Sequence, residues 1–492
     1  MNRRITIIKF MIILALHSLF ELISMKKILI AYFLFASWTS FSQQKTLSGS
    51  GQPNIIIFFM DDMGSQDLRC YGNNFYQSPT IDFLASKGVR FTNAYSSCTV
   101  CSPTRASLMT GKYPSKLHLT DWIKGHIKPW AKLTVPDWTM YLPLKEKTLA
   151  ESLKERGYTT WHVGKWHLGD DEKYWAENQG FDVNIAGNFK GSPNKNGFYN
   201  GYFSPYGLAR LKDGPKDEYL TDRLTEDAID LIDKHHNGTP FFLYLAHYAV
   251  HTPIQGKKDK TEKYKKLLDK PDPQKNPEYA AMIESVDENI ARVMKKLEEK
   301  NLLNNTLLVF ASDNGALESV STSKPFKKGK GWAYEGGTRT PLILYWKGKI
   351  EGGKVIEEPV ITMDIYSTIF DIVGLKQKKE VDGKSLLPVI FGNKSYDRPL
   401  FWHYPHYHND NPHGSVRYGD WKLIQYFEDN HYELYNLTTD TGETIDLVSQ
   451  NPEKLKHLKN LMEKWRKKMQ VQMPAPNENY EPARQNELAE SR

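Results

Sequence analysis

Two long apolar runs, each followed by acidic residues, constrain the fold of this 492-residue chain more than any other feature. The first run, Asn54–Met60, leads directly into Asp61 and Asp62, and the second, residues 305–311, leads into Asp313 and Asn314. Continuous apolar runs are typical of strands covered on both faces, which occur where helices flank a mostly parallel sheet. We therefore predict an α/β fold that delivers oxygen atoms at the carboxyl ends of both strands, where such folds bind ligands.

The four polar residues that follow these strands predict a cation site. Two adjacent carboxylates repel each other unless a cation neutralises them, although a solvated acidic turn is the alternative for Asp61 and Asp62 taken alone. Asp313 and Asn314 would complete a set of three carboxylates and one amide. Hard oxygen ligands without clustered thiols or imidazoles favour Ca²⁺ or Mg²⁺ over zinc.

A second informative segment, residues 101–112, predicts a loop that turns into a short helix with Pro103 in its first turn. Cys101 would then lie at the helix N-terminus, where unpaired N–H groups and the helix dipole favour an anion. Arg105, one turn further on, adds a fixed positive charge. This segment suits a nucleophile or an anionic substrate.

The three cysteines leave alternatives open. Cys98 and Cys101 form a Cys-x-x-Cys pattern, but a thioredoxin-like site is expected near the start of a small domain, not inside a large chain. A disulfide between Cys70 and Cys98 is the other alternative, and it would leave Cys101 unpaired for chemistry. Three cysteines do not form a disulfide framework, so the fold must rest on its core.

The pattern Cys101-x-Pro103-x-Arg105-x-x-x-x-Thr110-Gly111 resembles the signature of the type I sulfatases, and matching segments recur as far as about residue 447. This resemblance implies an alkaline phosphatase-like fold and a sulfuric ester hydrolase. It further implies that a maturation enzyme oxidises Cys101 to formylglycine (3-oxoalanine). It favours Ca²⁺ over Mg²⁺ as the bound cation, with the ligands Asp61, Asp62, Cys101, Asp313 and Asn314.

Three further segments match the family's catalytic motifs. They are Gly164-Lys165-Trp166-His167-Leu168-Gly169, the His251-Thr252-Pro253 string, and a loop containing Gly329-Lys330-Gly331. Alternatives to these assignments are surface groups for Lys165 and His167 and an ordinary basic loop around Lys330. The nearby His247 could equally be a core residue.

The resemblance assigns roles to these residues. Arg105, Lys165 and Lys330 would neutralise the sulfate, usually the largest catalytic contribution. Asp313 would take a proton from the attacking group, and His251, assisted by Lys330, would protonate the leaving sugar alcohol. His167 would take the proton whose loss releases sulfate.

Two other functional classes compete with this prediction. A phosphoesterase of the same superfamily would be expected to use Ser or Thr as nucleophile and two zinc ions held by Asp and His, and no such ligand set is apparent. A non-catalytic binder of sulfated glycans would typically have lost ligands or the cysteine. An unmodified Cys101 would still leave a binder.

The substrate and location are predicted only by class. Of the net charge of +7, residues 1–42 contribute a net +4, and the remainder is too small to favour nucleic acid. Residues 1–42 resemble a leader for export to the periplasm or the outside of the cell, with translation beginning at Met1 or Met25. Its apolar run is too short to span a bilayer comfortably, so we expect cleavage and no stable membrane insertion. The partners expected are a sulfated polysaccharide or glycosaminoglycan fragment and the maturation enzyme.

The chain is predicted to divide into a catalytic domain (52–395) and a smaller subdomain (396–472). The first should contain a large, mixed, mostly parallel sheet between helices, and the second an antiparallel sheet with one closing helix. Histidines crowd the start of this subdomain, and His403 and His406 are candidates for substrate binding, with surface histidines as the alternative. Residues 473–492, rich in polar groups, are expected to be a disordered tail.

Overall fold

The computed structural model describes residues 11, 51–193, 201–236, 238–272, 274–392 and 394–491. The chain forms two compact units, Met1–Gly51 and Gln52–Arg492, and the following account concerns the second. The predicted leader, 1–42, lies outside the described residues except for Met11. Among the described helices, none combines the length and apolar character needed to cross a membrane.

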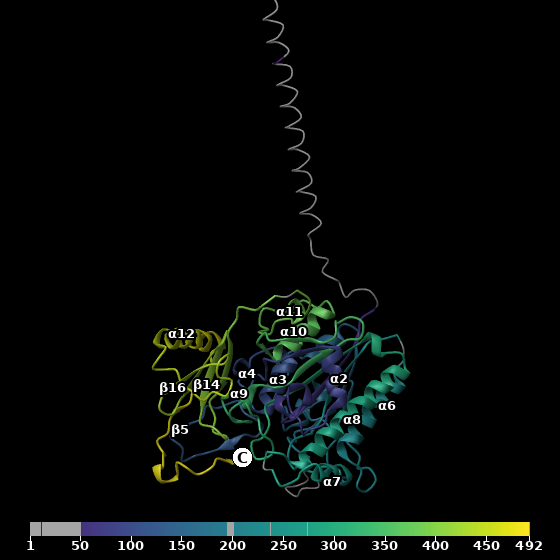
Figure 1. Ribbon diagram of the computed structural model, residues 1–492, viewed down its shortest axis with the longest axis horizontal. Coiled ribbons are helices and arrows are strands. Elements are labelled where there is room, and N and C mark those ends of the chain that lie inside the picture. Colours follow the sequence, from purple (N-terminus) through teal and green to yellow (C-terminus); the bar gives the residue numbers. More distant parts are fainter. Residues whose placement is uncertain are drawn as a thin grey trace, which may run out of the picture. The chain divides into compact units, whose positions relative to one another are not determined.

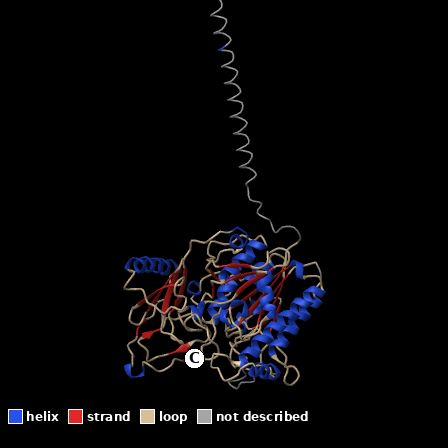
Figure 2. Ribbon diagram, viewed as in Figure 1, coloured by secondary structure: helices blue, strands red, loops and turns tan. Residues whose placement is uncertain are grey.

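The two apolar runs pair with each other at the centre of an eight-stranded sheet. Figure 2 draws the strands in red and the helices around them in blue. They form β1 (Asn54–Met60) and β9 (Thr306–Ser312), which are parallel and fully buried. Beyond β1 follow three parallel strands, β8 (Phe241–Ala246), β6 (Thr159–Gly164) and β7 (Val183–Ile185). Beyond β9 follow the antiparallel β10 (Leu342–Tyr345), then β2 (Val89–Phe91) and β11 (Lys354–Ile356). The predicted mixed, mostly parallel sheet is confirmed.

Helices cover both faces of this sheet (Figure 1). One face packs against α2 (Pro79–Lys87), α6 (Leu220–Lys234) and α8 (Pro277–Glu299), and α7 (Lys258–Lys266) contacts α8. On the opposite face α3 (Cys101–Thr110) contacts α5 (Leu149–Lys154) and α10 (Met363–Ile372). The guanidinium of Arg105 in α3 lies 5.4 Å from the ring centroid of Phe59, which places α3 against β1.

Helix α3 begins and ends where the sequence predicts. Val100, in an extended conformation, precedes its first residue, Cys101, and Pro103 lies in the first turn. Gly111 ends the helix in the left-handed region, at φ 69°, where glycine has no steric penalty. A Cβ at Gly111 would lie 2.6 Å from Cδ1 of Tyr366. Every residue of the helix is buried, so Cys101 is held in a fixed position.

The C-terminal part forms the smaller antiparallel sheet that the sequence predicts. Its strands are β13 (Leu400–Tyr404), β14 (His413–Tyr418), β15 (Trp421–Tyr426) and β16 (Tyr432–Asn436), and α12 (Pro452–Met469) packs against β14 and β15. Lys422 of β15 joins this sheet to the catalytic part. Its Nζ lies 3.0 Å from Glu335 of α9 (Glu335–Thr338) and 2.9 Å from Glu443, and all three side chains are buried.

The segment after α12, residues 473–491, differs from the expected disordered tail. Its strand β17 (Ala475–Pro476) pairs with β5 (Leu133–Thr134), and β18 (Glu490–Ser491) pairs with β4 (His126–Ile127). The polar composition of the segment gave no sign of this, because strand pairing uses backbone groups and the partner strands lie more than 300 positions earlier in the chain. We call residues 473–491 the C-terminal segment.

Shorter elements complete the fold. They are η1 (Ser65–Asp67), η2 (Arg69–Tyr71), β3 (Ala94–Tyr95), α4 (Pro114–Leu117), η3 (Glu172–Tyr174), η4 (Ala176–Asn178), η5 (Leu303–Asn305), β12 (Val360–Ile361), α11 (Leu387–Gly392) and η6 (Pro482–Arg484).

Candidate active site

The acidic residues that follow β1 and β9 meet at one edge of the large sheet. The backbone N–H of Asp62 donates to Oδ1 of Asp313 (3.1 Å), and Nδ2 of Asn314 donates to Oδ1 of Asp62 (2.8 Å). Asp61, Asp313 and Asn314 are completely buried, and Asp62 is 3 % exposed. The alternative of a solvated acidic turn is therefore wrong.

Three basic side chains surround these carboxylates. Arg105 donates through both Nε (2.9 Å) and Nη2 (2.7 Å) to Oδ2 of Asp313. Nζ of Lys165 lies 2.7 Å from Oδ2 of Asp61, and Nζ of Lys330 lies 2.7 Å from Oδ1 of Asp62. Lys165 and Lys330 are buried, so neither is a surface group or part of an ordinary basic loop. Three basic side chains thus face the three carboxyl groups of Asp61, Asp62 and Asp313.

Burial and these ion pairs shift the pKa values of the cluster. Burial raises the pKa of Asp61 well above its ordinary value, although Lys165 opposes the shift. For Asp62 burial acts in the same direction, but Lys330 and His251 outweigh it and lower the pKa. Burial disfavours the charge of Lys330, yet Asp62 outweighs burial and raises the pKa of this lysine. Lys330 is therefore positively charged where it faces the cavity.

The donor set fits a hard divalent cation. Oδ1 of Asp61 and Oδ1 of Asn314 are buried and accept no hydrogen bond from the described residues, a costly state unless another group binds them. Asp61, Asp62 and His251 also offer ligand atoms within 4.8 Å of one another. Oxygen-rich sites of this kind suit Ca²⁺ or Mg²⁺. A divalent cation would add positive charge to this cluster, which an anionic substrate could neutralise.

Cys101 lies beside His167 at the start of α3. Its Sγ is 3.4 Å from Nδ1 of His167, while Nε2 of that ring donates to the carbonyl of Ile123. Because Nε2 carries the proton, Nδ1 is an acceptor that faces residue 101. Burial lowers the pKa of His167 well below its ordinary value and raises that of the Cys101 thiol. The pair thus consists of a neutral base and a protonated thiol.

Cys70, Cys98 and Cys101 are all free, so the possible Cys70–Cys98 disulfide is not formed. The Cys-x-x-Cys pattern is likewise unpaired. Burial raises the pKa of Cys98 to about 12. A buried thiol of this kind is inert, and the redox alternative loses its support.

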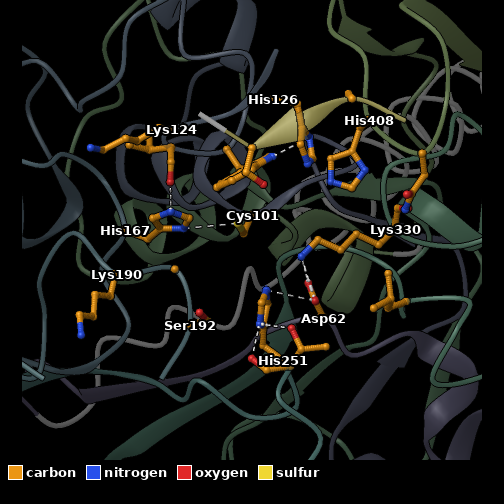
Figure 3. Close-up of a pocket in the computed structure, with 18 of the residues that line it drawn as sticks. Asp62, Cys101, Lys124, His126, His167, Lys190, Ser192, His251, Lys330 and His408 are labelled. Atoms are coloured by element: carbon orange, nitrogen blue, oxygen red, sulfur yellow. Dashed lines mark hydrogen bonds and ion pairs between the residues drawn. The ribbon is translucent and has the colours of Figure 1, made fainter. Parts of the chain in front are cut away.

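A cavity of about 770 Å³ opens above this cluster (Figure 3). Five of the predicted site residues line it: Asp62, Cys101, His167, His251 and Lys330. Arg105, Lys165 and Asp61 do not line it; they are bonded to one another and to Asp313.

His251 faces the same space. Its Nε2 lies 3.5 Å from Oδ2 of Asp62, and its Nδ1 donates to the carbonyl of Thr252 at 2.8 Å. Burial lowers the pKa of His251 to about 4. The neighbouring His247 is completely buried and is not among the residues that line the cavity.

The two histidines predicted to bind substrate lie elsewhere. Nε2 of His403 donates to the carbonyl of Gln472 (2.8 Å), and Nε2 of His406 bonds to Oγ1 of Thr120 (2.8 Å). Both are buried, and neither is among the residues that line the cavity. His408 lines it instead. The cluster of histidines indicated the correct loop, but the sequence could not show which side chain points inward.

Sequence reasoning missed several other residues of the cavity wall. His126, Lys124, Lys190 and the C-terminal residues Leu488, Ala489 and Ser491 all line it. Lys190 lies in a stretch rich in glycine and asparagine, and His126 lies in the two-residue strand β4, which has no recognisable pattern. His126 and His408 face each other with ring centroids 4.6 Å apart.

Comparisons with known proteins agree with this geometry. Residues 53–375 match the sulfatase family, and residues 327–472 match the C-terminal region of the N-sulphoglucosamine sulphohydrolase family. A sulfatase of Formosa agariphila is 32 % identical, over 84 % of this chain and 87 % of that protein. Human N-acetylgalactosamine-6-sulfatase is 30 % identical, over 72 % of this chain and 69 % of that protein.

A solved structure shows the same relationship. The crystal structure of Ps i-CgsB in complex with k-i-k-neocarrahexaose superposes with a TM-score of 0.71 and 29 % sequence identity, over 84 % of this chain and 93 % of that one. Together with the matches in sequence, it establishes that the chain belongs to the sulfatase family and is a sulfuric ester hydrolase.

Proposed function

We propose that this sulfatase removes sulfate from a sulfated carbohydrate, using a formylglycine made from Cys101 and a bound Ca²⁺. The observation that carries the proposal is the position of Cys101, on the wall of the cavity beside His167 and near the charged cluster. An unmodified thiol would be a poor nucleophile there, because burial raises its pKa. Conversion of the side chain to formylglycine would remove this difficulty.

Residue 101, once modified, supplies a hydrated aldehyde with one hydroxyl for attack on sulfur and a second whose deprotonation releases sulfate. A cation held by Asp61, Asp62, Asp313 and Asn314 would supply positive charge next to the sulfate oxygens. We propose that this site binds Ca²⁺ in preference to Mg²⁺. Residue 101 itself is the fifth proposed ligand.

The basic residues of the site stabilise the negative charge of the sulfate in two ways. Lys330 lines the cavity and can contact the sulfate directly. Arg105 and Lys165 hold Asp313 and Asp61 in place, and so act on the sulfate through those carboxylates. Such fixed charges need no reorganisation during the reaction, which is why they lower its barrier.

Three residues transfer protons in the proposed reaction. Nδ1 of His167 faces residue 101 as an acceptor, where it could take the proton of the second hydroxyl; loss of that proton would re-form the aldehyde and expel sulfate. Asp313 is the proposed acceptor for the first proton. His251 is the proposed donor to the leaving alcohol; because it is neutral without substrate, the negative charge of the ester would have to favour its protonation, and Lys330 can assist.

The substrate class rests on the names of relatives and on the cavity. One relative is an N-acetylgalactosamine-6-sulfatase, and a similar structure is a complex with k-i-k-neocarrahexaose. A cavity of about 770 Å³ is of the size that small-molecule ligands occupy. We propose sulfated galactan or glycosaminoglycan fragments as substrates, export of the protein to the periplasm or beyond, and a formylglycine-generating enzyme in its host.

The first test is the mass of the tryptic peptide 91–105 from protein made in its native host. We expect residue 101 to carry an aldehyde and to resist alkylation. Protein with this modification should release sulfate from neocarrageenan oligosaccharides or from oligosaccharides containing N-acetylgalactosamine 6-sulfate. Chelation should abolish the release, and Ca²⁺ should restore it more fully than Mg²⁺.

Cys101→Ala is the matched control. The variant should melt at nearly the same temperature, because the thiol makes a single hydrogen bond to a side chain, yet its sulfate release should fall by at least 10³-fold. Sulfate release at the wild-type rate by this variant, or an alkylatable thiol in an active preparation, would refute the formylglycine proposal.

A further inference from the structure

The C-terminal segment lies against a single stretch of the catalytic part, residues 126–134. Besides the two strand pairings, the backbone N–H groups of Asn477 and Glu481 donate to the carbonyls of Lys132 and Trp130, each at 3.1 Å. Nζ of Lys128 donates to the carbonyl of Gln485 at 2.9 Å. The segment therefore follows this stretch along its length until it reaches the cavity.

The end of the segment forms part of the cavity wall. Leu488, Ala489 and Ser491 line the cavity together with Cys101 and Lys330. Leu488 is 83 % exposed, the highest value among the exposed large apolar side chains of the described residues. Because Leu488 lies on the cavity wall, its exposed side chain offers an apolar contact to a molecule bound there. A pyranose ring has such a face, formed by its C–H groups.

The segment also supports a polar residue of the cavity. Strand β18 pairs with β4, in the register Ser491 to His126, so the backbone of His126 is part of the same small sheet. Nε1 of Trp122 donates to Nδ1 of His126 at 3.2 Å. Since Nδ1 accepts, the ring proton of neutral His126 lies on Nε2, which makes Nε2 a donor. Figure 3 shows the ring of His126 beside that of His408, with a strand in the yellow of the chain's C-terminal end next to them.

We propose that the C-terminal segment completes the binding site for the carbohydrate part of the substrate. Leu488 contacts the C–H face of a sugar ring, and His126, positioned by the β4–β18 pairing, donates a hydrogen bond to a sugar hydroxyl. Neither residue takes part in bond breaking. Their contacts with the sugar would determine which glycan binds. The inference rests on the proposed function and specifies how that site recognises its substrate.

The test compares Leu488→Asp with Ile445→Asp in the full chain. Both positions are exposed leucine or isoleucine residues, so neither change should unfold the protein, but Ile445 does not line the cavity. With the glycan panel named above, Leu488→Asp should raise KM about 10-fold and leave kcat within twofold. Ile445→Asp should change neither. The affinity of each variant for the same glycans is measured in parallel in the inactive Cys101→Ala background.

A second comparison tests the positioning of His126. His126→Gln should raise KM about 10-fold relative to the full chain. In a chain lacking residues 486–492, where β18 no longer holds His126, the same substitution should raise KM much less relative to that truncated chain. This loss of additivity is the signature of coupling between the two elements. A purely structural role for the segment would instead lower stability without this dependence.

The outcomes separate the two proposals. If the parent chain hydrolyses or binds a glycan and Leu488→Asp changes neither KM nor affinity, or if Ile445→Asp has an equal effect, the inference is overturned. If the parent binds glycans but releases no sulfate, the proposed function fails while the affinities still decide the inference. A parent chain that neither binds nor hydrolyses any member of the panel overturns both.

Discussion

The side chain of His403 is buried where it cannot readily take up a proton. The free energy of unfolding should therefore depend on pH. Burial lowers the pKa of His403 to about 3, whereas the unfolded chain should show the ordinary value of 6.5. Between these values the unfolded state binds the extra proton, so stability decreases as the pH falls.

The prediction compares wild type with His403→Asn. The stability advantage of wild type over the variant should shrink by about 2 kcal/mol between pH 7 and pH 5, because the unfolded chain takes up the proton below about pH 6.5 and each pH unit below that value costs about 1.4 kcal/mol. Urea denaturation at the two pH values measures it. Because His403 does not line the cavity, KM should not change. A constant stability difference, or a raised KM, would contradict this structural role.

At the scale of single elements, the end of α3 shows how tightly the catalytic helix is held. Gly111→Ala should cost about 1–2 kcal/mol for the left-handed conformation, and a further 1–3 kcal/mol, roughly, because the new methyl group overlaps Tyr366. Thermal or urea denaturation measures the total.

Gly157→Ala is the matched control for this helix end. Gly157 also has a positive φ, of 82°, but a Cβ there would meet nothing within 4 Å. Its cost should therefore be the conformational part alone, about 1–2 kcal/mol. Equal losses in the two variants would mean that the contact with Tyr366 relaxes freely.

Elements also show what could and could not be predicted from the sequence. The central strands, α3 and α12 follow from local apolar runs, turn residues and helix signals, and so do the acidic residues at the strand ends. The direction of a side chain within a loop does not: His408 points into the cavity, whereas His403 and His406 form other hydrogen bonds. The strand pairing of the C-terminal segment could not be predicted from the sequence either, because backbone hydrogen bonds require no particular side chains.

At the scale of the whole molecule, a buried ionic cluster joins the small sheet to the catalytic part. Lys422 bonds to both Glu335 and Glu443, and Tyr95 of the catalytic part donates to Glu335 at 2.6 Å. Removing one partner of a buried ion cluster leaves uncompensated charge and typically costs about 3–5 kcal/mol. Lys422→Met should therefore destabilise the protein by about this amount.

Calorimetry of Lys422→Met tests whether the two parts unfold together. We expect a single transition at a lower temperature, because the cluster couples the predicted domain 52–395 to the subdomain 396–472. Lys456→Met, a change on the exposed side of α12, should stay within about 0.5 kcal/mol of wild type. Two separate transitions in wild type would show that the parts are independent.

The burial of α3 has a consequence for when the enzyme becomes active. Cys101 is 3 % exposed, and every residue of its helix is buried. If Cys101 must be oxidised, the oxidising enzyme has access to it only before the chain folds around it. The specific activity of a preparation would then record the conditions of its synthesis, and folded protein that missed this step could not acquire activity by later treatment without first being unfolded.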